Sequence, residues 1–134
     1  MTTPHAFLDP RGWKQPRGYA NGIAAEGRMI FIAGQVGWNA EQQFETADFV
    51  AQARQALANI VTLVHEGGGA AEHITRLTWF VTDKKEYLSR LSDLGAAYRS
   101  VMGSHFPVMT LVQVVALVED AAKVEIEATA VVPH

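Results

Sequence analysis

The chain has 134 residues, a formal net charge of -3 and an apolar fraction of 49%, which fit one globular domain with a core of its own. It contains no cysteine, which excludes disulfides, thiolate nucleophiles and cysteine-ligated metal sites. Acidic and basic residues are interspersed, and no apolar run approaches the ~20 residues of a membrane span, so we expect neither a nucleic-acid partner nor a membrane contact.

The N-terminal part of the chain reads as extended structure. Residues 1–17 hold three of the five prolines and little periodicity, which predicts an extended arm on a single domain spanning 1–134. The first residues show no basic stretch followed by an apolar run, so we expect no signal peptide and a cytoplasmic location. A weak strand is predicted over 19–24. The compact apolar run 29–33 predicts a strand buried on both faces.

The middle of the chain predicts two helices around one strand. Thr46 is a candidate N-cap, and apolar residues then recur at three- and four-residue spacing until the glycine triplet that begins at Gly67. Residues 74–82, rich in β-branched and aromatic side chains, predict a strand. Asp83, with a glutamate three residues later, has the spacing of a capping box and predicts one helix that ends at Gly103.

Two strands are predicted at the end of the chain, over 109–118 and 122–132. The resulting order is typical of an α+β fold in which two helices pack on one face of a mixed sheet. Both final strands carry apolar residues on both faces, and only one face can pack on the helices. We therefore expect a partner sheet, and hence an oligomer, to cover the other face.

Several short segments, taken in their order and spacing, resemble the reactive-intermediate deaminase family (Rid, also called YjgF-type, often labelled endoribonuclease L-PSP). The segments that carry the resemblance are Gly18-Tyr19, 31–37, 51–60 and 124–128, together with a pair of strand-like runs, 106–114 and 123–132, similar to the family's closing hairpin. The resemblance covers the chain from about Tyr19 to its C-terminus. It implies a chorismate-mutase-like α+β fold, a homotrimer whose sheets close into a central barrel, and three clefts between subunits.

The resemblance also implies which residues line such a cleft. In active members these are a tyrosine, the backbone after a strand, an arginine and a glutamate, at the positions of Tyr19, Gly34 with Gln35, Met109 and Glu125. The glutamate would orient water or shuttle a proton to an imine or enamine. The alternative is a strand carboxylate paired with a cation such as Lys123.

Three further points about the site stay open in the sequence. Glu127 lies on the same strand face as Glu125 by period two, so the pattern does not rank the two. Trp38 is a candidate for an apolar wall of the cleft, and Trp79 for either a wall or core packing. The histidines have no metal-ligand spacing, so we expect neither a metal ion nor a cofactor.

Met109 is the main departure from the family pattern. An arginine there would hold a substrate carboxylate with a bidentate fork, whereas methionine offers soft apolar surface. Gly95 similarly stands where many members have asparagine. Either the substrate lacks a carboxylate at that end, or another cation such as Arg17 replaces the arginine, or catalysis is lost.

Three functions follow from these alternatives. The first is a hydrolase of imine- or enamine-type small metabolites with altered substrate anchoring. The second is a non-catalytic trimeric module that binds a metabolite. The third and weakest is a ribonuclease, because the charge pattern gives RNA little to hold.

Overall fold

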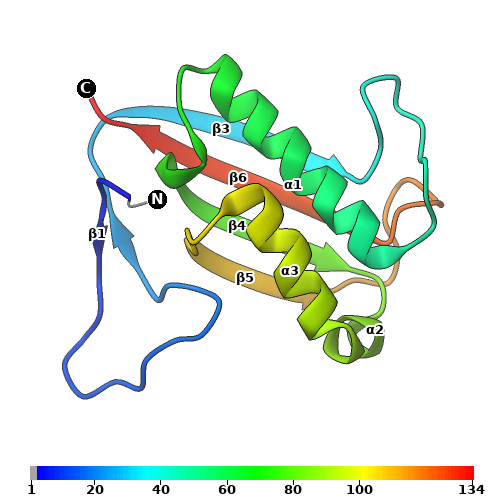
Figure 1. Ribbon diagram of the computed structural model, residues 1–134, viewed down its shortest axis with the longest axis horizontal. Coiled ribbons are helices and arrows are strands. Elements are labelled where there is room, and N and C mark those ends of the chain that lie inside the picture. Colours follow the sequence, from blue (N-terminus) through cyan, green and yellow to red (C-terminus); the bar gives the residue numbers. More distant parts are fainter. Residues whose placement is uncertain (1–2) are drawn as a thin grey trace.

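Four strands form the main sheet and pair in the order β3-β6-β4-β5. β6 (Val124–Val132) lies antiparallel to both β3 (Arg28–Val36) and β4 (Ile74–Val81), whereas β5 (Val108–Gln113) lies parallel to β4. Figure 1 shows this mixed sheet in the computed structural model, which describes residues 3–134. The mixed α+β fold is confirmed. The predicted closing hairpin is wrong, because β6 pairs with β3 and β4 and leaves β5 at the edge.

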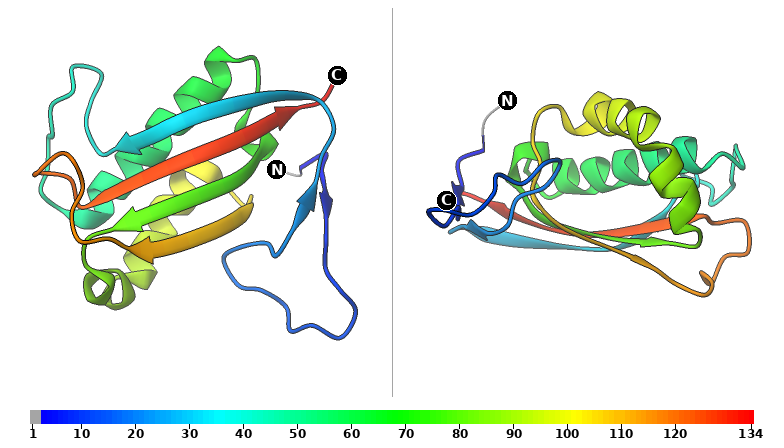
Figure 2. Two further views of the ribbon diagram at one scale, coloured as in Figure 1. Left: turned by 180° about the vertical axis from the view of Figure 1, so that it is seen from behind. Right: turned by 90° about the horizontal axis from the view of Figure 1, so that it is seen from below.

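Three α-helices lie on one face of the sheet, and the other face carries none (Figure 2). α1 (Phe49–Glu66) ends at Gly67 as predicted. Its N-cap is Asp48, whose carboxylate accepts from the Ala51 amide, so the predicted cap at Thr46 is wrong. Thr46 lies two residues before this cap, and its hydroxyl accepts a hydrogen bond from the Asp48 amide.

The single helix predicted between Asp83 and Gly103 is also wrong, because it is broken at Arg90. Asp83 caps α2 (Lys84–Ser89) and α3 (Leu91–Met102) follows, with Arg90 between them at φ -119° and ψ 23°. The Arg90 guanidinium donates to the carboxylates of Asp48 at 2.9 Å and Asp93 at 3.2 Å. These contacts tie the helix break to the start of α1. A 3-10 turn, η1 (Ala71–His73), precedes β4.

The N-terminal arm is more ordered than predicted. β1 (Ala6–Phe7) pairs antiparallel with β2 (Ile23–Ala24), and the chain between them projects from the main body (Figure 1). The strand predicted over 19–24 is therefore reduced to β2 and a parallel bridge from Ala20 to Val108 on β5. Residues 1–2 of the predicted arm lie outside the described residues.

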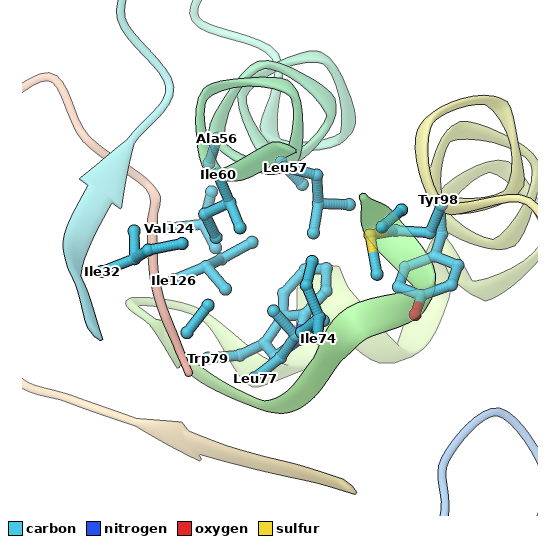
Figure 3. Close-up of a cluster of buried hydrophobic side chains, with 14 of the residues drawn as sticks. Ile32, Ala56, Leu57, Ile60, Ile74, Leu77, Trp79, Tyr98, Val124 and Ile126 are labelled. Atoms are coloured by element: carbon cyan, nitrogen blue, oxygen red, sulfur yellow. The ribbon is translucent and has the colours of Figure 1, made fainter. Parts of the chain in front are cut away.

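The core lies between the helices and the inner face of the sheet (Figure 3). Its centre is formed by side chains with no exposed surface from α1, β4 and β6, including Leu57, Ile60, Leu77, Val124 and Ile126. No helix among residues 3–134 combines the length and apolarity needed to cross a membrane.

The outer face of the sheet is uncovered in the single chain, and exposed apolar side chains such as Phe31 lie there beside polar ones such as Arg76 and Glu127. Phe31 and Met29 on β3 are 75% and 54% exposed, so the prediction that this strand is buried on both faces is wrong for one copy. β5 ends at Gln113 because β4 ends opposite it at Val81. Val115, predicted within the last strand pair, therefore lies in a fully exposed loop.

Candidate functional site

A cavity of about 270 Å³ lies between the edge strand β5, the two shorter helices and the N-terminal arm. Met109 and Leu111 are two residues apart on β5 and pair with Leu77 and Trp79 of β4, so all four face the helices. The cavity is lined by Arg17, Gly18, Tyr19, Trp79, Tyr87, Leu91, Leu94, Gly95, Tyr98, Phe106, Met109 and Leu111. It is therefore mainly aromatic and aliphatic.

One wall of the cavity is fixed by buried hydrogen bonds. The Tyr98 hydroxyl donates to the His105 carbonyl at 2.6 Å, and the Tyr98 ring stacks on Phe106 at a centroid distance of 4.9 Å. The His105 imidazole in turn donates from Nε2 to the Ile74 carbonyl at 2.7 Å. Burial raises the pKa of the Tyr98 hydroxyl and lowers the pKa of His105, so both groups are neutral near pH 7. This wall is rigid and uncharged.

Arg17 and the indole of Trp79 line the cavity without a partner in the described part of the chain. Arg17 is the one charged side chain that lines the cavity, and it forms no ion pair with any described residue. Trp79 is 4% exposed, and its indole N–H donates to no described acceptor. The cavity therefore offers one cation at the arm, whereas the indole nitrogen of Trp79 is buried inside its wall.

The structure brings four of the predicted residues into this cavity: Arg17, Tyr19, Trp79 and Met109, and Trp79 is both a wall of the cavity and part of the core. The bridge from Ala20 to Val108 explains their proximity, because it fixes the end of the arm beside the start of β5. Gly95 lines the same cavity from α3. Tyr87 and Leu91 were not predicted as lining residues. Their place beside the cavity depends on the helix break at Arg90, which the sequence pattern did not reveal.

A second group of predicted residues lies on the opposite face of the sheet. A Cβ atom built on Gly34 would lie 2.8 Å from the Cδ and Oε2 atoms of Glu125, so the carboxylate lies directly over this glycine. Glu125 is half-buried, whereas Glu127 is exposed in a separate shallow groove with Phe31 and Arg76. Neither glutamate forms an ion pair with a described residue.

The remaining predicted residues lie near the end of β3. The Gln35 side chain donates to the Ala33 carbonyl at 3.0 Å. Trp38 packs against Phe44 with ring centroids 5.7 Å apart, and its carbonyl accepts from Asn59. Neither Gln35 nor Trp38 lines the cavity that holds Met109.

One copy of the chain thus keeps the two halves of the predicted site apart. Met109 faces the helices, Glu125 faces away from them, and β4 runs between their two strands. Within residues 3–134, no group of three or more His, Asp or Glu side chains is placed to hold a metal ion. The chemistry available to the site is therefore that of a carboxylate, a guanidinium and an apolar cavity.

Comparison with known proteins identifies the same architecture. The family model described as Endoribonuclease L-PSP matches residues 14–132. The 2-iminobutanoate/2-iminopropanoate deaminase of Escherichia coli K12 is 34% identical over 116 residues, which are 84% of this chain and 86% of that protein. The crystal structure of YyfB, a Rid protein of Yersinia pestis, has a TM-score of 0.85 at 26% identity, covering 96% of this chain and 98% of that one. The structure of E. coli TdcF with bound serine has a TM-score of 0.67 at 28% identity over 95% of this chain and 98% of that one.

Proposed function

Because the chain belongs to the reactive-intermediate deaminase (Rid) family, we propose that it hydrolyses imines of 2-imino acids in clefts between the subunits of a homotrimer. In this proposal residues 1–134 form one domain, and the N-terminal arm of each copy contributes to a cleft. A relative named as a 2-iminobutanoate/2-iminopropanoate deaminase, at 34% identity, supports the reaction class.

The separation of the two half-sites supports a cleft between subunits. Met109 and Glu125 lie on opposite faces of one sheet, so a second copy has to bring its Glu125 to the cavity that holds Met109. The uncovered outer face, which exposes apolar side chains such as Phe31 at 75%, is the surface on which copies would pack.

In the proposed reaction, Glu125 accepts a proton from a water molecule as the water oxygen bonds to the imine carbon. The imine nitrogen takes this proton from Glu125, which gives a carbinolamine. The hydroxyl proton of the carbinolamine then passes through Glu125 to the nitrogen as the carbon–nitrogen bond breaks, and the nitrogen leaves as ammonia. The carbon keeps the water oxygen as a carbonyl, so the products are a 2-oxo acid and ammonia. A half-buried carboxylate without an ion-pair partner is suited to this proton transfer.

The observation that carries the proposal is that Arg17 and Met109 line the same cavity. A guanidinium from the arm can hold the substrate carboxylate that family members hold with an arginine at the position of Met109. Such charge-assisted bonds contribute ~1.5–3 kcal/mol each. Arg17 is free for this role because it forms no ion pair with any residue that the structure describes.

Turnover of enzymatically generated 2-iminobutanoate tests the proposal. We expect Arg17→Ala to lower kcat/KM by about ten- to a hundredfold, since one bond of ~1.5–3 kcal/mol is lost. Arg11→Ala, a matched arginine on the same arm that does not line the cavity, should leave turnover unchanged. Glu125→Gln should lower kcat with little change in KM. Equal loss from Arg11→Ala and Arg17→Ala would contradict a specific anchor.

Assembly is tested separately by light scattering. We expect a mass of three times 14.6 kDa, and a mass of one chain would refute the shared cleft. The second candidate function, a metabolite-binding module, is favoured by the uncharged residues Met109 and Gly95 in the cavity. A trimer that binds 2-oxobutanoate but leaves 2-iminobutanoate at its uncatalysed rate would establish that function instead.

A further inference from the structure

The cavity has two ends, which the strand register places. The arm reaches the start of β5 through the bridge from Ala20 to Val108, so Arg17 lies at the end near Met109. Leu111 lies two residues further along β5, ~6.6 Å away by strand geometry. The cavity therefore extends well past the point where a carboxylate held by Arg17 would sit.

The far end of the cavity, near Leu111, is formed by the helix break. The Lys84 amide at the start of α2 donates to the Gln113 side chain at 2.8 Å, which holds this helix beside the end of β5. Tyr87 from α2 and Leu91 from α3 then line the cavity there. This end has the walls of an aromatic-binding pocket.

Trp79 adds an aromatic ring to this end, because it pairs in register with Leu111 and lines the cavity. Its indole nitrogen is buried inside the wall, so the side chain contributes apolar ring surface to the cavity and no hydrogen-bond donor. No charged side chain lines this end, since the one charge in the lining is Arg17 at the other.

We infer that this cavity selects 2-imino acids with a long, ring-bearing side chain. The carboxylate lies at Arg17 and the ring lies among Tyr87, Leu91 and Leu111. This inference rests on the proposed function, since it uses Arg17 as the carboxylate anchor. It goes beyond that function by naming the side chain that the substrate carries.

Binding of unreactive carboxylates to the wild-type assembly tests the inference by isothermal titration calorimetry. The probes are butanoate and 3-phenylpropanoate. We expect the phenyl probe to bind at least about tenfold more tightly than butanoate, because the ring is buried among apolar walls.

Leu91→Asp tests the ring site without disturbing the core, because Leu91 is 49% exposed on the cavity wall. It should weaken 3-phenylpropanoate binding by more than about tenfold and leave butanoate binding unchanged. Leu88→Asp, at a leucine that is 58% exposed and does not line the cavity, is the control. Equal affinity of butanoate and the phenyl probe in the wild type would overturn the inference. Ring selectivity without turnover of any imine would overturn the hydrolase and support the inference.

Discussion

Replacement of the buried glutamine Gln52 by leucine should strongly destabilise the fold. Gln52 on α1 is completely buried, and its side chain binds the backbone at two separate places. Its Nε2 donates to the carbonyls of Thr46 at 3.1 Å and Ala121 at 2.9 Å, and its Oε1 accepts from the Lys123 amide at 2.8 Å. This one amide therefore joins α1 to the loop before it and to the loop that leads into β6.

The magnitude follows from these three hydrogen bonds. Leucine has a similar volume, so packing changes little, and the loss is that of three bonds at ~1 kcal/mol each, about 3 kcal/mol in all. Denaturant unfolding at one fixed protein concentration measures it, because assembly would otherwise shift the apparent stability.

Gln55→Leu, one helical turn along α1, is the matched control. The Gln55 side chain donates to one partner, the Asn59 side chain at 2.8 Å, so we expect a loss of ~1 kcal/mol or less. A loss below ~1 kcal/mol for Gln52→Leu, or equal losses for the two variants, would refute the reasoning.

Three further outcomes are expected. Met109→Arg in the Arg17→Ala background should raise 2-iminobutanoate turnover by about tenfold or more, since it adds a charge-assisted bond of ~1.5–3 kcal/mol. A double variant that assembles but shows no gain would mean that the cavity lacks more than its anchor. Burial lowers the pKa of His105 below its ordinary 6.5, so protons bind the unfolded chain more readily than the folded one. The free energy of unfolding should therefore be highest above pH 6.5 and decrease as the pH falls through the folded-state pKa. Melting temperatures of His105→Gln should lack this part of the pH dependence, and identical pH profiles would contradict it. Asp48→Ala should lower stability by ~1 kcal/mol in denaturant unfolding through loss of the α1 N-cap, and an unchanged midpoint would contradict the cap.

Periodicity predicted the elements whose stability is local and missed the features that depend on distant partners. α1, β4 and the strand that holds Glu125 were predicted within a few residues, because their apolar spacing matches one buried face. The helix break at Arg90 escaped prediction, since a carboxylate 42 residues earlier in the chain holds it. The place of β6 between β3 and β4 is likewise set by long-range pairing that no local pattern records.

The candidate site was predictable in its residues and only partly in its arrangement. The resemblance proposed Tyr19, Met109 and Glu125, and the sequence distance from Arg17 to Tyr19 suggested the substitute cation. That Arg17 and Met109 share a cavity depends on the bridge between the arm and β5. The buried indole nitrogen of Trp79 was beyond prediction, because an indole in a strand gives no sign of whether its N–H finds an acceptor.

The position of Arg17 on a projecting loop has a consequence for protein engineering. The segment between β1 and β2 contributes no side chain to the core except Ala20, so its sequence can be exchanged without repacking the interior. A library confined to this loop would vary the charge and reach of the proposed substrate anchor while Glu125 on β6, the proposed proton acceptor, stays fixed. Specificity and stability are therefore separable traits in this scaffold, and selection for new imines can begin with about a dozen exposed positions.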